Sequence, residues 1–275
     1  MTGSKQACSL LFFAIFAIFN ISLNSMANSG VKDLSFEELV DSADYYSAHK
    51  RWEDAERATV NALRLKPANK TNWLLWSNLA EIRNNLHDTE GALTAYNVGL
   101  SLQPNSEKML TGRAALFLQE KRFEDAISDL DHLLENDSTL EWPRMIRGML
   151  MLDQGHTEKA EKDFIMLKRL YPENPQSYNG LATIKARNGD YEEAVKLYNS
   201  SLALSPDENI YFYKVLLLAD HGKLPEASES LREAMKTYPR NGNLFLLRAY
   251  IHKLNFQNDE AEIALKLAKE YGADT

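Results

Sequence analysis

The residue types that most often carry catalysis or bind metals form no recognisable constellation in this sequence. The histidines are scattered, without the HExxH or paired spacing of a metal site, at His49, His87, His132, His156, His221 and His252. Cys8 is the only cysteine, so the chain beyond it has no disulfide, thiolate ligand or cysteine nucleophile. Neither a nucleophile-elbow sequence (G-x-S-x-G) nor a glycine-rich phosphate loop occurs. The sequence therefore predicts a non-enzymatic protein with no cofactor and no metal.

Two arginines have an aspartate at the same distance along the chain. Arg113 is followed sixteen residues later by Asp129, and Arg147 is followed sixteen residues later by Asp163. Such an arginine can bind a ligand, or it can form an internal ion pair that joins two helices. We favour the internal pair, because a buried guanidinium needs a partner.

The elements that hold these residues are pairs of amphipathic helices. In residues 176–206, Tyr178, Leu181 and Ala182 have the spacing of one helical face, and Gly189 then interrupts the pattern. A second apolar face follows from Tyr191 to Leu202. This stretch is predicted to form a helix, a tight turn and a second helix. Neither helix can bury its apolar face alone, so the pair needs copies of itself on both sides.

The copies are marked by a small residue early in each second helix. These alanines are Ala55, Ala92, Ala126, Ala160, Ala194, Ala227 and Ala261, and their successive spacings are 37, 34, 34, 34, 33 and 34 residues. A methyl group at this position allows two helices to cross closely, so the alanines are predicted to be structural. The spacing of 37 predicts a longer loop near Asn69.

The repeated residues resemble the tetratricopeptide repeat (TPR) family, whose pattern has a period of 34 residues. In the second repeat the matching residues are Trp76, Leu79, Ala80, Ala92, Tyr96 and Pro104. The resemblance extends from Phe36 to about Tyr271. It implies an all-α fold, a right-handed superhelical α-solenoid of about seven helix hairpins. The expected repeats are 36–67, 73–104, 107–138, 141–172, 175–206, 208–239 and 242–271, within one solenoid domain at 35–271.

The N-terminal residues predict export. A short positive region with Lys5 precedes an apolar run from Ala7 to Phe19, and small residues end the segment at Ser25-Met26-Ala27. This order is typical of a secretory signal peptide at residues 1–27, followed by a short segment at 28–34. The expected location is periplasmic or secreted. The alternative is an uncleaved membrane anchor, although the run is shorter than the roughly 20 residues that span a bilayer.

The charge of the chain restricts its partners. The net charge is −8, with acidic residues in every repeat and no cluster of Lys and Arg. An acidic chain of this kind is a poor candidate for binding nucleic acid or anionic membranes. The expected partner is a protein or peptide, with no nucleic acid and no membrane insertion once the signal is cleaved.

By resemblance to TPR proteins, residues fifteen and eleven positions before each repeated alanine line a concave groove that holds a peptide or a partner helix. In the last four repeats they are Met145 and Met149, Asn179 and Thr183, Phe212 and Leu216, and Leu246 and Tyr250. Trp142 lies three residues before Met145. The Lys and Asn of the family's carboxylate clamp are missing at these positions, so recognition of a C-terminal acid is not carried over.

Two functions are compatible with this set of residues. Methionine and aromatic side chains favour an interaction scaffold with an apolar groove. The alternative is a small-ligand or glycan-binding protein, in which Trp142, Tyr250 and Asn179 form a stacking platform. A third possibility for Met145 and Met149 is that they pack inside the protein and bind nothing.

Overall fold

Helices account for the regular structure of the part that is described, residues 34–274 of the computed structural model. Fourteen helices, α2 to α15, occur in this range, and no strand occurs in it. The prediction of an all-α fold of paired helices is confirmed. The helices group into two compact units, residues 1–120 and 121–275. That residues 35–271 form a single continuous solenoid stays a prediction.

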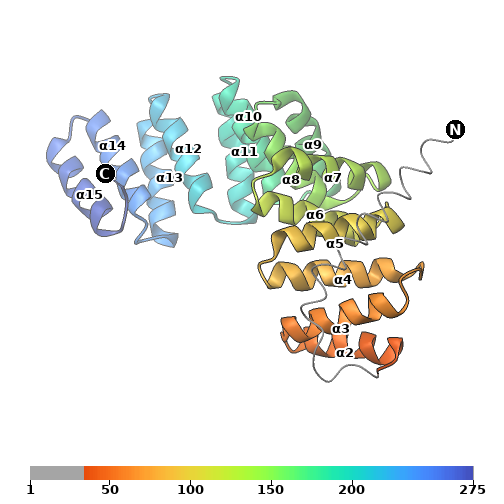
Figure 1. Ribbon diagram of the computed structural model, residues 1–275. Helices are drawn as coiled ribbons and strands as arrows, with labels where there is room; N and C mark the ends of the chain where they lie inside the picture. Colours follow the sequence, from red (N-terminus) through yellow and green to blue (C-terminus); the bar gives the residue numbers. More distant parts are fainter. Residues whose placement is uncertain (1–33, 275) are drawn as a thin grey trace. The chain divides into compact units, whose positions relative to one another are not determined.

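Unit 1 contains two helix pairs and the first helix of a third pair. Its helices are α2 (Phe36–Ala48), α3 (Trp52–Leu65), α4 (Asn72–Asn85), α5 (Thr89–Leu102) and α6 (Glu107–Gln119). The two helices of each pair run antiparallel and pack against each other (Figure 1). The predicted signal peptide, residues 1–27, lies outside the described residues.

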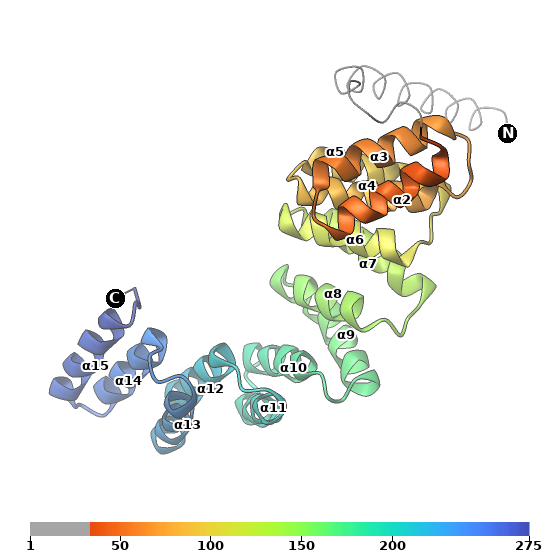
Figure 2. The same ribbon diagram turned by 90° about the horizontal axis from the view of Figure 1, so that it is seen from below.

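Unit 2 contains one further helix and four complete pairs. Its helices are α7 (Phe123–Asn136), α8 (Glu141–Asp153), α9 (Thr157–Leu170), α10 (Pro175–Arg187), α11 (Tyr191–Leu204), α12 (Glu208–Asp220), α13 (Leu224–Thr237), α14 (Gly242–Leu254) and α15 (Asn258–Glu270). We call the first helix of each pair the A helix and the second the B helix. The A helices α8, α10 and α12 lie along one side of unit 2, and the B helices α9, α11 and α13 lie along the other (Figure 2).

Local sequence sets where the helices begin and how they are joined. Ser35 and Glu38 form the predicted capping box at the start of α2, in which Glu38 N donates to Ser35 Oγ and Ser35 N donates to Glu38 Oε2. The longer loop expected near Asn69 is present at residues 66–71, whereas the next loop between pairs spans only 103–106. Both features were predictable because they depend on neighbouring residues alone.

The repeated alanines lie where the helices of a pair meet. All seven, from Ala55 to Ala261, are fully buried, with no exposed surface. A glycine allows a similarly close approach between α9 and α10. A Cβ on Gly180 of α10 would lie 2.4 Å from ring atoms of Phe164 in α9. The core therefore alternates between large side chains and positions that admit a methyl group or less.

The turn between the A and B helices has one backbone geometry throughout. The residue five positions before each repeated alanine has a positive φ, and these residues are Lys50, His87, Lys121, Gly155, Gly189, Gly222 and Phe256. Glycine adopts this left-handed conformation without a steric penalty, whereas other residues do so at a cost. The turn geometry is thus conserved among the repeats even where the residue is unfavourable for it.

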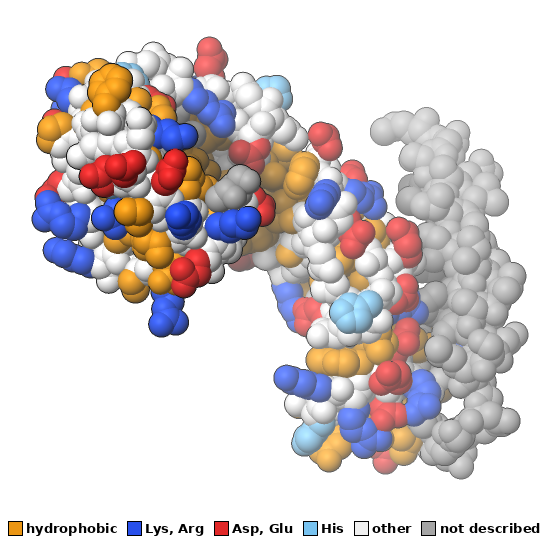
Figure 3. All heavy atoms as spheres, turned by 90° about the vertical axis from the view of Figure 1, so that its left-hand side faces the viewer, with side chains coloured by type: hydrophobic (Ala, Val, Ile, Leu, Met, Phe, Trp, Pro, Cys, Tyr) orange, Lys and Arg blue, Asp and Glu red, His pale blue; other side chains and the backbone are white. Residues whose placement is uncertain are grey.

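The last helix of unit 2, α15, has a mostly polar outer face, as expected, with one large apolar residue, Ile263, exposed on it. Glu262, Lys266, Lys269 and Glu270 of α15 are exposed, while Ala261, Ala264 and Ala268 are buried. Figure 3 looks onto this end of the unit, where charged side chains are interspersed with hydrophobic ones. The charged side chains on this face limit the apolar surface that α15 leaves exposed.

Candidate binding surface

The nine residues predicted to line a groove all lie on A helices of unit 2, but they differ in exposure. Met149 on α8 is 42% exposed and Tyr250 on α14 is 36% exposed. The other seven are partly buried: Trp142, Met145, Asn179, Thr183, Phe212, Leu216 and Leu246. Three of these seven, Met145, Phe212 and Leu216, pack against the hydrophobic core of the unit. Part of the predicted groove is therefore core, and Met149 and Tyr250 are its freely accessible apolar side chains.

Sequence reasoning missed Tyr213 of α12, which is 52% exposed. It lies fourteen residues before Ala227, so a rule based on fifteen and eleven residues passes over it. Its ring makes an edge contact with Phe212, with the two ring centroids 5.9 Å apart. The available signal was the run Tyr211-Phe212-Tyr213, because three successive residues of a helix cannot all face the core.

Polar contacts join the A helices of unit 2 to neighbouring helices along this surface. The hydroxyls of Thr183 (α10) and Tyr198 (α11) are 3.5 Å apart. Burial raises the pKa of Tyr198, and the nearby Tyr213 of α12 raises it further. On the next pair, the Tyr250 hydroxyl donates to Asp220 Oδ1 at 2.7 Å, and this bond to a carboxylate raises the pKa of Tyr250. The exposed ring of Tyr250 is thus held by a hydrogen bond to the neighbouring A helix.

The amide groups near α8 and α10 are largely occupied by the protein itself. Asn174 Nδ2 donates to Glu141 Oε1 at 2.8 Å and lies 3.9 Å from Met145 Sδ. Asn179 Nδ2 donates to Gln176 Oε1 at 3.4 Å, whereas Asn179 Oδ1 is buried and has no hydrogen-bond partner. We define the A-helix surface as the exposed Met149, Tyr213 and Tyr250 together with the seven partly buried residues of the predicted groove.

The two predicted arginine–aspartate pairs have different outcomes. Arg147 donates to Asp163 through Nε at 2.8 Å and through Nη2 at 2.7 Å, which places them in the internal ion pair that their spacing suggests. This bonding raises the pKa of Arg147 above the ordinary arginine value. Arg113 and Asp129 lie in different units, so their pairing stays a prediction; Arg113 Nη1 donates to Asn97 Oδ1 at 2.6 Å within unit 1.

Two members of the Arg147 network were not predicted. Arg144, one turn earlier on α8, is 6% exposed and donates from Nη1 to Asp163 Oδ1 at 3.1 Å. Asp131 of α7 accepts from Arg147 Nη1 at 2.7 Å. Arg147 therefore has three of its donors engaged, which leaves it unsuited to hold a ligand.

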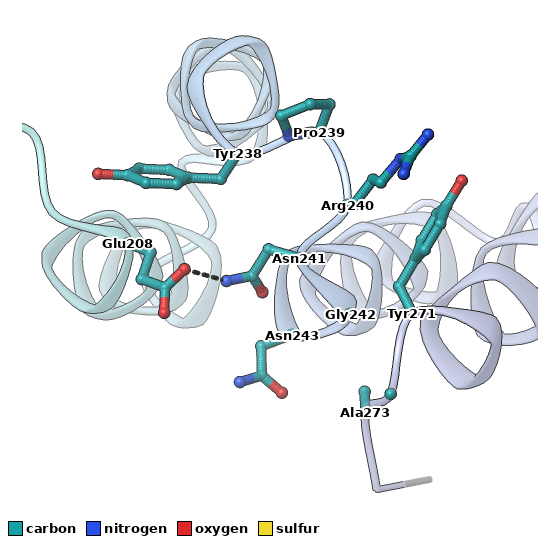
Figure 4. Close-up of a pocket in the computed structure, with 10 residues that line it drawn as sticks. Glu208, Tyr238, Pro239, Arg240, Asn241, Gly242, Asn243, Tyr271 and Ala273 are labelled. Atoms are coloured by element: carbon teal, nitrogen blue, oxygen red, sulfur yellow. Dashed lines mark hydrogen bonds between the residues drawn. The ribbon is translucent and has the colours of Figure 1, made fainter.

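A separate hollow of about 590 Å³ lies in unit 2, among the start of α12, the loop between α13 and α14, and the residues that follow α15 (Figure 4). It is lined by Glu208, Tyr238, Pro239, Arg240, Asn241, Gly242, Asn243, Tyr271, Gly272 and Ala273. Asn241 Nδ2 donates to Glu208 Oε2 across it, and the Tyr238 hydroxyl donates to Pro206 O at 2.9 Å. The side chains of Glu208, Tyr238 and Asn241 are thus already engaged within the protein. None of Trp142, Asn179 and Tyr250 lines it, so it does not correspond to the stacking platform considered above.

Two other kinds of site are absent from residues 34–274. No three His, Cys, Asp or Glu side chains in this range are placed to hold a metal ion. No helix of the described part is both long enough and apolar enough to cross a membrane.

Comparison with known proteins places these helix pairs in a known class of repeat. Residues 147–209 match the sequence profile of the family described as "Tetratricopeptide repeat". The chain therefore has the fold of TPR structures, and residues 147–209 match the TPR family itself. The TPR fold is typical of scaffolds for protein–protein interaction, and such proteins are generally non-enzymatic.

Similar proteins support the fold over most of the chain. A TPR protein from Parabacteroides merdae is 24% identical, with a TM-score of 0.65 over 87% of this chain and 94% of that one. YrrB, described as a TPR protein with an unusual peptide-binding site, is 19% identical, with a TM-score of 0.52 over 66% of this chain and 94% of that one. Superkiller protein 3 of Schizosaccharomyces pombe is 23% identical over 229 residues, which are 80% of this chain. The aligned region is only 15% of the length of that relative.

Proposed function

We propose that this TPR protein is a non-enzymatic interaction scaffold that binds a peptide segment or a helix of a partner protein on its A-helix surface. The observation that carries the proposal is the exposure of Met149, Tyr213 and Tyr250 on A helices of one unit, at 42%, 52% and 36%. Large apolar side chains left accessible on one side of a fold mark interaction sites. Methionine and tyrosine are frequent at such sites because they adapt to a partner and contribute large contact areas.

The chemistry of the A-helix surface supports a protein ligand. Its hydroxyl and amide groups lie beside apolar side chains, so a peptide could bury its side chains and hydrogen-bond its backbone at the same place. Arg147 on α8 is bonded through all three of its nitrogens to Asp131 and Asp163, which removes a strong anion-binding group from the site. The peptide-binding site described for YrrB is consistent with this use of the fold.

The test is a charge substitution on the A-helix surface compared with one outside it. Met149→Glu is expected to abolish binding of a partner identified by crosslinking in cells, because burial of a carboxylate against apolar side chains is unfavourable. Ile263→Glu on α15 is the matched control, since Ile263 is 59% exposed at a position where the other six repeats have polar residues. Equal binding of the partner by wild type and Met149→Glu would contradict the proposal. Circular dichroism of both variants checks that the helices remain.

We further propose that the protein is exported and that residues 1–27 are removed as a signal peptide. The order of a positive region, an apolar run and small residues supports this location. N-terminal sequencing of the protein recovered from the cell envelope or medium is expected to begin at Asn28. An intact Met1 terminus in a soluble cell extract would contradict export.

A further inference from the structure

The turn between α14 and α15 differs from every other turn of its kind in this protein. The positive-φ position holds glycine in three turns, and Lys50, His87 and Lys121 in three more. In the last turn it holds Phe256, whose φ is +59° and whose side chain is 91% exposed. A bulky residue with positive φ is rare, because its Cβ approaches the backbone oxygen.

Phe256 therefore carries two penalties that no packing within its unit offsets. Its backbone is in the left-handed region, and its ring remains in water. Leu254, at the end of α14, is a second exposed apolar residue, at 37%. The equivalent residues of the other six repeats are Ala48, Asn85, Gln119, Asp153, Arg187 and Asp220. Backbone strain and exposed apolar surface that coincide at one turn point to a function for this turn.

The edge of unit 2 that carries this turn is acidic. It is formed by the ends of the A helices and the first turns of the B helices. In the last three repeats its carboxylates are Asp190, Glu192, Glu193, Asp220, Glu226, Asp259 and Glu260. The cations of the same segments are fewer, namely Lys185, Arg187, Lys223 and Lys253. Two of them are already engaged, because Lys185 Nζ lies 3.5 Å from Glu161 Oε1 and Arg187 Nη1 donates to Leu152 O at 3.0 Å. A partner that covers Phe256 gains attraction if positive charges flank its apolar contact.

The neighbouring surfaces limit the form that this partner takes. The outer face of α15 exposes Glu262, Lys266 and Lys269 around one apolar residue, Ile263, so a second copy of the chain that stacked onto the end would have to bury these charges. The described part of unit 2 has no strand whose edge an extended peptide could join. A helix presents apolar side chains on one face and charges beside them, which matches an apolar pair inside an acidic edge.

We propose that the α14–α15 turn is a docking point for an amphipathic helix of a partner protein, with Leu254 and Phe256 as its apolar anchors and the acidic edge attracting Lys or Arg beside the apolar face of that helix. This site is distinct from the A-helix surface and does not depend on the function proposed there. Phe256 stays exposed because the partner, and not the protein itself, buries it.

The proposal is tested with a defined probe, a fluorescein-labelled synthetic helix of about 18 residues with Leu on one face and Lys on the other, long enough to be helical in water. Its matched control carries Glu in place of every Lys. Fluorescence anisotropy with the full chain is expected to show binding of the Lys helix and at least tenfold weaker binding of the Glu helix. Absence of binding by the Lys helix, or equal binding of the two, would overturn the proposal.

Substitutions in the protein separate docking at the turn from general attraction between opposite charges. Phe256→Gly and Leu254→Asn are each expected to weaken binding of the Lys helix at least tenfold, although neither changes the net charge. Leu65→Asn, which alters a leucine that is 55% exposed on α3, is expected to leave the affinity unchanged. Equal affinity for wild type and Phe256→Gly, or an equal loss from Leu65→Asn, would refute the assignment.

The thermal stability of the same variants distinguishes lost contacts from lost folding. Phe256→Gly is expected to raise Tm while it lowers affinity, because glycine relieves the left-handed backbone. Phe256→His introduces histidine, the residue found at the equivalent position, His87, of the turn between α4 and α5. It provides the binding test if the glycine variant does not fold. The anchor role would be contradicted if Phe256→Gly had a lower Tm than the wild type and Phe256→His bound the Lys helix with wild-type affinity.

Discussion

Asp163 is the residue whose removal is expected to destabilise unit 2 most. Its side chain is 5% exposed and accepts three hydrogen bonds, from Arg144 Nη1 at 3.1 Å, Arg147 Nε at 2.8 Å and Arg147 Nη2 at 2.7 Å. Asp163→Ala leaves Arg144, which is buried, with the carbonyl of Ser138 as its remaining acceptor in the network. An uncompensated buried charge of this kind costs about 3–5 kcal/mol.

This free energy corresponds to a large change in melting temperature. For a unit of this size, 1 kcal/mol shifts Tm by about 2–4 °C, so Asp163→Ala is expected to lower Tm by roughly 6–20 °C. The change is measured by thermal and urea unfolding, followed by circular dichroism. An unchanged urea m-value confirms that the variant unfolds from the same folded state.

Asp131→Ala is the matched control. Asp131 is half exposed, at 47% of its side chain, and accepts only from Arg147 Nη1. Loss of an exposed pair costs about 0–1 kcal/mol. A Tm for Asp163→Ala equal to that of Asp131→Ala would refute the reasoning that burial makes this network costly to break. Recovery of stability when Arg144, Arg147 and Asp163 are all replaced by apolar residues of similar volume would support it.

Four further substitutions test the turns, the core and a buried amine. His87→Gly is expected to raise the free energy of unfolding by about 1 kcal/mol, and Gly155→Ala to lower it similarly although its Cβ meets open space, both measured by urea unfolding. Gly180→Ala is expected to cost about 1–3 kcal/mol because the new methyl overlaps the ring of Phe164, and an unchanged Tm would exclude that contact. Burial lowers the pKa of Lys214, so the folded state loses its proton more readily than the unfolded state and gains stability as pH rises toward the ordinary lysine value. Lys214→Met is therefore expected to raise Tm at pH 7, by an advantage that shrinks toward pH 10, whereas a constant difference would contradict the sign.

Features that depend on spacing along one chain were predictable from the sequence. Ala194 and its equivalents are buried because a period of 34 residues fixes their place in each pair, and Ser35 with Glu38 forms a cap through neighbouring residues. The approach of Arg147 to Asp163 follows from the same register, since sixteen residues connect facing sites on the two helices of a pair.

Features that depend on how helices pack side by side were not predictable to the same degree. Met145 and Phe212 lie at the positions predicted for the groove but pack against the core, because side-chain direction and the neighbouring helices decide their exposure. Tyr213 was passed over because the positions at fifteen and eleven residues come from an idealised repeat. Arg144 joined the ion network across two helices, which no single spacing reveals.

The central claim, that the A-helix surface of unit 2 binds a protein partner, is tested most directly by site-specific photo-crosslinking in cells. A photoreactive residue is placed in turn at Met149, Tyr213, Tyr250 and, as the control on the outer side of α15, Ile263. The account predicts that the first three positions crosslink to the same partner and that Ile263 does not. Crosslinks to that partner from Ile263 alone, or equally from all four positions, would contradict it.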